Sequence, residues 1–349
     1  MHVLSTLGLS LLVSVAAGWQ LQEDYGNDSS FFDKFTFFTD EDPTHGFVTY
    51  VDQSTATSAG LISANDGTVH IGVDSTNSID PNGAGRQSVR ISSTATYSVG
   101  TLSYSRFGTY ARDCVWKLAC LPWPAEGEID IIEYVNTNQQ NQMTLHTSPG
   151  CSITNYGSGT SAGSTDCEGS NGCGVIDTDP NSLGSGFNNA GGGVYATQWA
   201  ADSISIWFFP RNSITSDITN GTPDPTQWGT PVASFGGSSC NFSTAFANMQ
   251  IVFDITFCGD WAGSSGSYQC GGGATCQQYV ADTPSAYSDS YWGINSLKVY
   301  TGTGSQKRAE VPKVNHAHAA EHINRRSNHH ARPGPRPNLK SRRDTMAGL

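Results

Sequence analysis

Short apolar runs separated by turn-forming residues dominate the chain between residues 19 and 300. Within the runs, hydrophobic and polar residues alternate with the period of two that is typical of half-buried strands, and we find no long helical stripe. The runs that we expect to form strands are Thr68–Val73, Ser88–Ile91, Met143–Thr147, Ile204–Phe209, Met249–Phe257 and Leu297–Tyr300. The Gly-, Asn-, Asp- and Ser-rich segments between them predict one all-β domain, a sandwich or barrel, over residues 19–300.

The two ends of the chain differ from this central part. The apolar stretch Val3–Val15 and the small residues Ala16-Ala17-Gly18 are too short to span a bilayer and predict a signal peptide over residues 1–18. Residues 301–349 lack a periodic apolar pattern and are rich in His, Arg, Asn and Pro, so we expect a disordered basic tail. We therefore expect a protein without a membrane span that is secreted to the extracellular space or the cell wall.

The cysteine content agrees with export. Nine cysteines would mostly pair in an oxidising compartment, and none forms a close Cys-x-x-Cys set with nearby histidines, so we expect no zinc site. Three acceptor sequences for N-glycosylation, at Asn27, Asn220 and Asn241, would then become available.

The charge of the chain excludes one class of ligand. The formal net charge is −12, but residues 301–349 hold ten of the 18 Lys and Arg residues and only three of the 30 acidic residues. The first 300 residues therefore carry eight basic and 27 acidic side chains, a net charge of −19. A domain this acidic will not bind nucleic acid through its phosphates, whereas neutral polymers such as glucans are compatible with it.

Three carboxylates lie close together in the segment Gly127–Glu133, which reads GEIDIIE. In a strand, Glu128 and Asp130 share one face, and the isoleucine between them points into the core. The doublet Ile131-Ile132 breaks this alternation. A β-bulge at the doublet adds one residue and returns Glu133 to the face of the other two carboxylates.

Such a cluster of like charges raises the pKa of its members and destabilises a fold, which favours a chemical role over a structural one. Cleavage of a glycosidic bond with retention needs two carboxyl groups about 5–5.5 Å apart, one ionised to attack the anomeric carbon and one protonated to assist the leaving oxygen. We predict that Glu128 and Glu133 are this catalytic pair and that Asp130 hydrogen-bonds the nucleophile. The alternative is an acidic strand that faces solvent.

Residues on either side of this segment indicate a sugar cleft. Polar and apolar residues alternate in Gln142–His146, so Gln142 and His146 would face the same cleft if the two strands pair. Trp123 and Trp261 are candidates to stack on sugar rings. A tryptophan is more often in the core, and a lone histidine is more often structural, so both alternatives stay open.

These segments together resemble glycoside hydrolase family 16, and most closely its fungal laminarinase-type endo-β-1,3(4)-glucanases. The likeness extends from about Phe31 to Tyr300. The stretches that carry it are Ser88–Ile91, Trp123–Asn136, Asn141–Thr147, Phe187–Asn189, Trp207–Arg211 and Phe257–Gly263.

The resemblance implies a β-jelly-roll sandwich of the concanavalin A-like type with a concave substrate cleft. It implies a retaining mechanism with Glu128 as nucleophile, Asp130 as its assistant and Glu133 as acid/base, without a cofactor or metal. We expect Arg90, within the matching stretch Ser88–Ile91, to contribute to substrate binding. The expected partner is a β-glucan of the laminarin or lichenan type, bound by a monomer.

One segment departs from the family pattern. Cys114–Trp123 is shorter than the corresponding segment of relatives, and Cys120 stands where an aromatic residue is expected, so we expect weaker hydrolysis than in a relative with the full segment. Two alternatives to an endo-hydrolase are therefore kept. One is a cell-wall glucan transglycosylase, in which a sugar replaces water as acceptor, and the other is a glucan-binding protein with weakened turnover.

Overall fold

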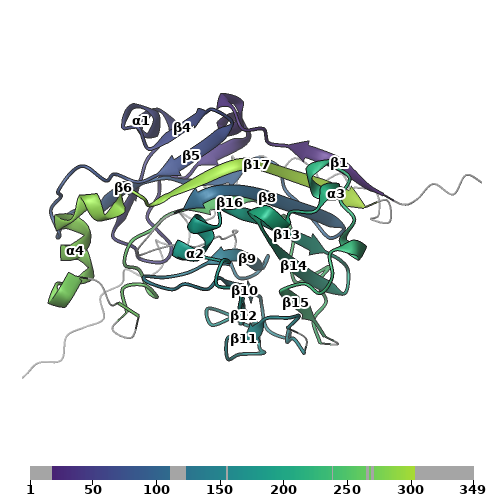
Figure 1. The fold of residues 1–349 in the computed structure, drawn as a ribbon. Helices are drawn as coiled ribbons and strands as arrows, with labels where there is room; N and C mark the ends of the chain where they lie inside the picture. The colour runs from purple at the N-terminus through teal and green to yellow at the C-terminus, as the bar shows by residue number, and fades with distance from the viewer. Residues whose placement is uncertain are drawn as a thin grey trace, which may run out of the picture. The chain divides into compact units, whose positions relative to one another are not determined.

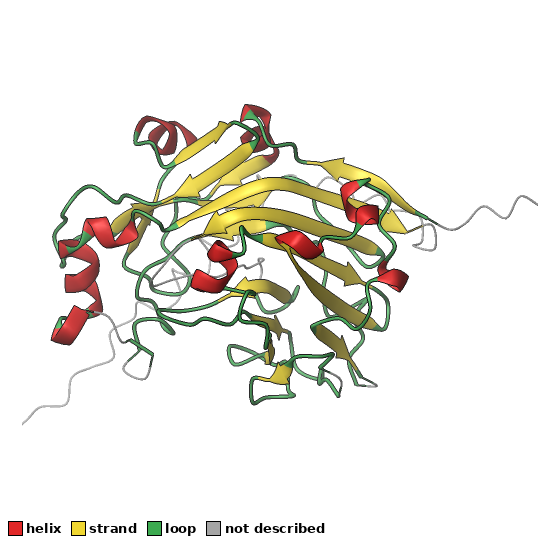
Figure 2. Cartoon of the chain, in the orientation of Figure 1, coloured by secondary structure: helices red, strands yellow, loops and turns green. Residues whose placement is uncertain are grey.

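Strands make up most of the regular structure of the chain (Figures 1 and 2). The computed structural model describes residues 18–110, 123–154, 156–237, 239–264, 267–268 and 271–302. Residues 1–17 of the predicted signal peptide, the shortened segment up to residue 122 and the predicted tail from residue 303 onward lie outside the described residues. Within the described part, no helix is long and apolar enough to cross a membrane.

The largest sheet is antiparallel and has eight strands. Its order is β15 (Ala233–Gly236), β14 (Ser203–Pro210), β13 (Gly193–Trp199), β8 (Thr101–Tyr110), β17 (Tyr291–Gly302), β5 (Thr68–Gly72) and β4 (Ile62–Asn65), and β1 (Trp19–Asp24) also pairs with β17. The long strands β8 and β17 lie at its centre and run above β9 and β10 in Figure 1.

Three smaller sheets accompany the large one. The four-stranded sheet has the order β11 (Thr160–Ser161), β12 (Cys173–Ile176), β10 (Gln142–His146) and β9 (Glu128–Glu133). The three-stranded sheet has the order β16 (Val252–Asp254), β7 (Arg90–Ser93) and β2 (Phe35–Phe37), and β3 (Val48–Tyr50) pairs in parallel with β6 (Arg86–Ser88). Neighbouring strands are thus often far apart in sequence, as in Greek-key sandwiches.

The main core lies between the large sheet and the smaller sheets. Ile71 and Phe107 of the large sheet belong to the same buried cluster as Ile91 and Leu145 of the smaller sheets. A second cluster, which includes Leu102, Tyr104, Val194, Trp207 and Trp228, covers the opposite face of the large sheet. Two packed layers around one main core are the expected arrangement of a β-sandwich, so the all-β prediction is confirmed.

Helices are short and lie in the connections. The α-helices are α1 (Gln53–Ser58), α2 (Gly184–Asn189), α3 (Ser216–Thr219) and α4 (Cys276–Asp282). The 3-10 helices are η1 (Ser29–Lys34), η2 (Arg211–Ser213), η3 (Pro225–Gln227), η4 (Gly271–Gly273) and η5 (Pro284–Tyr287). The predicted absence of a long helical stripe between residues 19 and 300 therefore holds for the described residues.

Four of the six predicted strands are confirmed as β5, β10, β14 and part of β17. Two predictions need correction. The run Ser88–Ile91 divides at Val89, because β6 pairs with β3 whereas β7 pairs with β2 and β16. In Met249–Phe257 only Val252–Asp254 is a strand, because only these residues pair with β7, and Met249 forms an isolated bridge to Tyr97.

Most of the cysteines form disulfides, as expected. The pairs in the described residues are Cys151–Cys240, Cys167–Cys173 and Cys258–Cys276. The other three cysteines, Cys114, Cys120 and Cys270, lie outside the described residues.

Candidate active site

The predicted β-bulge is present in β9. Along the antiparallel pair of β9 and β10, Glu128 lies opposite His146, Asp130 opposite Thr144 and Glu133 opposite Gln142. Between the last two pairs β9 advances three residues while β10 advances two, so β9 contains one extra residue. This extra residue restores Glu133 to the face that carries Glu128 and Asp130, as the doublet of isoleucines predicts.

The side chain of Asn141 takes over hydrogen bonds that the bulge interrupts. Its Oδ1 accepts from the backbone N–H of Glu133 at 3.0 Å, and its Nδ2 donates to the carbonyl of Ile131 at 2.8 Å. Asn141 is fully buried. Its side chain, and not water, therefore supplies the hydrogen-bond partners of these two backbone groups. Sequence reasoning did not assign Asn141 a role. A predicted bulge that leaves backbone groups unpaired, followed by an Asn at the start of the partner strand, is the signal that could have found it.

The chain enters β9 through a glycine that no other residue could replace without strain. Gly127 has a φ of 77°, a region that L-residues rarely adopt. A Cβ atom at this position would lie 2.4 Å from the ring of Phe246 and 2.6 Å from the carbonyl of Ala245. The start of the strand, and with it Glu128, is therefore packed tightly against Ala245 and Phe246.

All three carboxylates of β9 are buried. The exposed fractions are 1% for Glu128, 0% for Asp130 and 4% for Glu133. An acidic strand that faces solvent, the structural alternative, is therefore wrong for this segment. Thr144 on β10 donates its hydroxyl to Oε2 of Glu133 at 3.3 Å, which places this carboxylate against the neighbouring strand.

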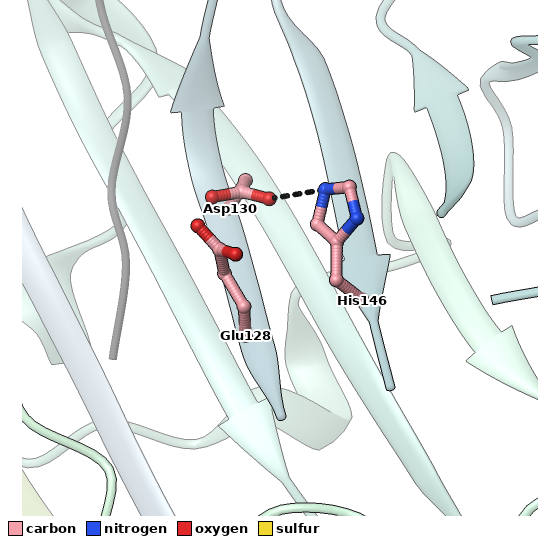
Figure 3. A group of neighbouring side chains, drawn as sticks. All are labelled: Glu128, Asp130 and His146. Carbon is pink, nitrogen blue, oxygen red and sulfur yellow. Dashed lines mark ion pairs between the residues drawn. The ribbon is translucent and has the colours of Figure 1, made fainter. Parts of the chain in front are cut away.

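The side chains of Asp130 and His146 contact each other (Figure 3). Nε2 of His146 lies 3.2 Å from Oδ2 of Asp130, and Nδ1 lies 2.7 Å from the carbonyl oxygen of Gly169. A carbonyl only accepts, so Nδ1 carries a hydrogen. The imidazole thus lies between the carbonyl of Gly169 and the carboxyl group of Asp130. The carboxyl of Glu128 lies beside this pair in Figure 3.

The same three side chains form the one group in the described residues that could hold a metal ion. One ligand atom each from Glu128, Asp130 and His146 lies within 4.8 Å of the others. A metal at this point would have to replace the contact between Asp130 and His146. The contact between His146 and Asp130 accounts for the close approach of these two groups without an ion, and the sequence predicts no metal here.

A cavity of about 670 Å³ opens over the carboxylates. Glu128 and Glu133 both line it, and the structure also brings all five predicted substrate-binding residues to its walls: Arg90, Trp123, Gln142, His146 and Trp261. Segments around Thr44 and Gly259, for which sequence reasoning assigned no role, complete the walls.

The two tryptophans of the cavity are exposed. Trp123 and Trp261 are each 37% exposed, and Leu21 is the one other large hydrophobic side chain among the described residues that is exposed. Two exposed indole rings at one cavity, in a chain whose other large apolar side chains are mostly buried, are typical of a sugar-binding surface.

Arg90 lies beneath the cavity as a buried cation. Its exposed fraction is 3%, and its Nη1 lies 2.7 Å from Oδ2 of Asp254. Burial alone would lower the pKa of Arg90, but the charge of Asp254, with smaller contributions that include Glu128, raises it. By the same attraction the guanidinium stabilises the ionised carboxylate of Glu128.

Comparison with known proteins agrees with this geometry. A family model described as the XgeA-like, catalytic GH16 domain matches residues 35–300. A probable endo-1,3(4)-beta-glucanase of Aspergillus niger is 41% identical over 338 aligned positions, which cover 89% of this chain and 44% of that protein. An endo-1,3(4)-beta-glucanase of Arthroderma benhamiae is 40% identical and covers 88% of this chain and 71% of that protein. The chain thus spans less than half the length of the A. niger relative.

Two solved structures are similar over most of the chain. Laminarinase 16A of Phanerochaete chrysosporium, with 6-O-glucosyl-laminaritriose in its donor and acceptor sites, has a TM-score of 0.76 and 36% identity and covers 82% of this chain and all of that chain. An elongating GH family 16 beta-1,3-glucosyltransferase has a TM-score of 0.75 and 39% identity, covering 81% and 100%. The expected jelly-roll fold is thereby confirmed, and the family model over residues 35–300 shows that the chain belongs to glycoside hydrolase family 16.

Proposed function

We propose that the protein is a secreted endo-β-1,3(4)-glucanase whose catalytic domain spans residues 19–300. The observation that carries this proposal is the bulged strand β9, which aligns three buried carboxylates under a cavity with two exposed tryptophans. The names of the A. niger and A. benhamiae relatives support the substrate class. The signal-like residues 1–18 and the disulfides support secretion.

In the first step, the ionised carboxylate of Glu128 attacks the anomeric carbon of the glucan. The glycosidic C–O bond breaks as Glu133 gives its proton to the leaving oxygen, and a covalent glycosyl-enzyme forms. The nearby charge of Arg90 favours the ionised nucleophile.

In the second step, Glu133 accepts a proton from a water molecule that attacks the same carbon. The bond to Glu128 breaks, and the product keeps the configuration of the substrate. Asp130 lies beside the nucleophile and contacts His146, which orients its carboxyl group.

A second candidate is transfer of the glycosyl group to a sugar instead of to water. The similarity to an elongating beta-1,3-glucosyltransferase, at 39% identity, favours this candidate. The first step is common to both reactions, and the acceptor alone differs.

Incubation of the full chain with laminarin and lichenan tests the proposal. Hydrolysis yields shorter oligosaccharides, transfer yields products longer than the substrate, and both keep the anomeric configuration seen by NMR. The variant Glu128→Gln is the control, because an amide cannot form the glycosyl-enzyme. Inversion of the anomeric centre, or turnover by this variant at the native rate, would refute the catalytic assignment. Binding without turnover in the native protein would favour the remaining alternative, a glucan-binding protein. Size-exclusion chromatography of the same sample tests the proposed monomer.

A further inference from the structure

A second cavity, of about 690 Å³, lies on the outer face of the large sheet. Its polar lining comes from five places in the sequence: Asn27, Thr68, Arg106, Arg211, Tyr291 and Asn295. Side chains alternate along β8, so Arg106 shares the face of Leu102 and Tyr104, which belong to the outer cluster. Phe107 points to the core between the layers. No residue in the described part of the chain lines both cavities, so this one is separate from the candidate active site.

The two arginines of this cavity stand apart from the other basic residues. The described residues contain six Lys and Arg side chains, and four of them form ion pairs with carboxylates. The four pairs are Lys34–Glu23, Arg86–Asp74, Arg90–Asp254 and Lys298–Asp24, with distances of 2.7, 3.4, 2.7 and 3.0 Å. The two cations without a carboxylate partner in this part of the chain are Arg106 and Arg211, and both line the same cavity.

Neutral oxygens hold Arg211 in place. Its Nε donates to the carbonyl of Gly191 at 2.7 Å, and its Nη2 donates to the carbonyl of Phe107 at 2.5 Å and to Oδ1 of Asn295 at 3.2 Å. Burial and then the charge of Arg106 lower the pKa of Arg211. The guanidinium is therefore oriented by the fold, but no neighbouring carboxylate balances its charge.

Arg106 has less support than Arg211. It is half-buried, and its Nε is buried without an acceptor among the described residues. A buried donor without a partner is destabilising, and the neighbouring charge of Arg211 adds repulsion. An acceptor that carries negative charge would offset both costs, because hydrogen bonds between ions are the strong ones.

We propose that this cavity binds an oxyanion, a carboxylate, phosphate or sulfate group, between Arg106 and Arg211. The volume lies within the range of about 300–1,000 Å³ that is typical of ligand sites, so the group can be carried by a sugar-sized molecule as well as be a free ion. The net charge of the chain is −12, so general attraction of anions does not explain binding, and affinity would report the local pair of arginines. This inference does not rest on the proposed catalytic function.

Calorimetric titration of the full chain with phosphate, sulfate and glucuronate, at constant ionic strength, tests the proposal. We expect saturable binding that Arg106→Gln weakens at least tenfold. The matched control is Lys298→Gln, which removes one positive charge elsewhere on the large sheet and should leave the affinity unchanged. Tight binding of phosphate or sulfate would identify a free anion as the source, and binding of glucuronate alone would identify an acidic saccharide.

Thermal unfolding without added anion supplies a second measurement. Because Arg106→Gln removes a like charge beside Arg211, the variant should unfold at the same temperature as the native protein or a higher one. If Arg106→Gln does not fold, Arg106→Lys takes its place in the titration. Lysine keeps the positive charge but lacks the planar guanidinium, so we expect this variant to bind the anions more weakly than the native protein. The proposal is overturned if none of the three anions binds saturably, or if the Arg106 variant binds them as tightly as the native protein.

Discussion

Replacement of Asn141 by alanine would test how the second catalytic carboxylate is positioned. The substitution removes the partners of two buried backbone groups, the carbonyl of Ile131 and the N–H of Glu133. Each unsatisfied group costs about 1–3 kcal/mol, so the free energy of unfolding should fall by roughly 2–6 kcal/mol. Domains are stable by about 5–15 kcal/mol, so the variant can still fold. Its backbone bonds to Ser182 and Asp177 do not involve the side chain and should persist.

The expected effect on activity is larger than the effect on stability. A displacement of about 1 Å in a reacting group can lower the rate roughly a hundredfold. We expect kcat on laminarin to fall by about this factor, with little change in KM, because Glu133 no longer reaches the leaving oxygen. An aryl glycoside with a good leaving group needs less acid assistance and should lose much less activity.

The assay compares kcat and KM on the two substrates, after thermal unfolding has shown that the variant is folded. The matched control is Asn138→Ala, which removes the same side chain from an exposed position in the same turn. Equal losses on both substrates would show that the variant damages the site generally. Native kcat on laminarin would show that the bulge holds Glu133 without this side chain.

Three other predictions follow from single residues. Glu133→Ala should lose most activity on laminarin, and azide should restore part of the activity on aryl glycosides; a variant that azide does not rescue would contradict the acid/base role. Burial raises the pKa of Asp177 from 3.8 to about 6 in the folded state, so the folded chain binds this proton more tightly than the unfolded chain. The resulting stability is present below pH 3.8 and is lost as pH rises through 6, a change of about 3 kcal/mol. The free energy of unfolding of Asp177→Asn should therefore rise relative to that of the native protein between pH 4 and pH 7. A difference between the two proteins that does not vary with pH would contradict this. Mass spectrometry of the secreted protein should find glycans at Asn220 and Asn241, which are exposed, and not at Asn27, whose Nδ2 donates to the carbonyls of Gly67 and Asn295. A glycan at Asn27 would show that these two bonds are dispensable.

Strand β9, which carries the three carboxylates, could be predicted from the sequence because the pattern that indicates it lies within a few consecutive residues. The alternation in Glu128–Asp130 and its interruption at Ile131-Ile132 specify both the face of the carboxylates and the bulge. The pairing with Gln142–His146 follows from a short turn between two alternating segments.

Other features could not be predicted because they depend on distant segments. Arg106 and Arg211 meet through the strand order of the large sheet, in which β13 and β17 both flank β8. The ten-residue strand Thr101–Tyr110 was not predicted, because its serine-rich face resembles the composition of a loop. Burial on both faces of the sheet compensates for that composition, and a single sequence does not show this.

A small covalent loop holds the carbonyl that orients His146. The disulfide Cys167–Cys173, six residues apart in sequence, encloses Gly169, whose oxygen accepts from Nδ1 of the imidazole. Gly172 of the same loop lies so close that a Cβ atom would be 2.7 Å from the imidazole ring. In a reducing environment this loop is released, and the imidazole beside Asp130 loses its covalently constrained neighbour. We therefore expect reduction of the Cys167–Cys173 disulfide to loosen the positioning of His146 beside Asp130.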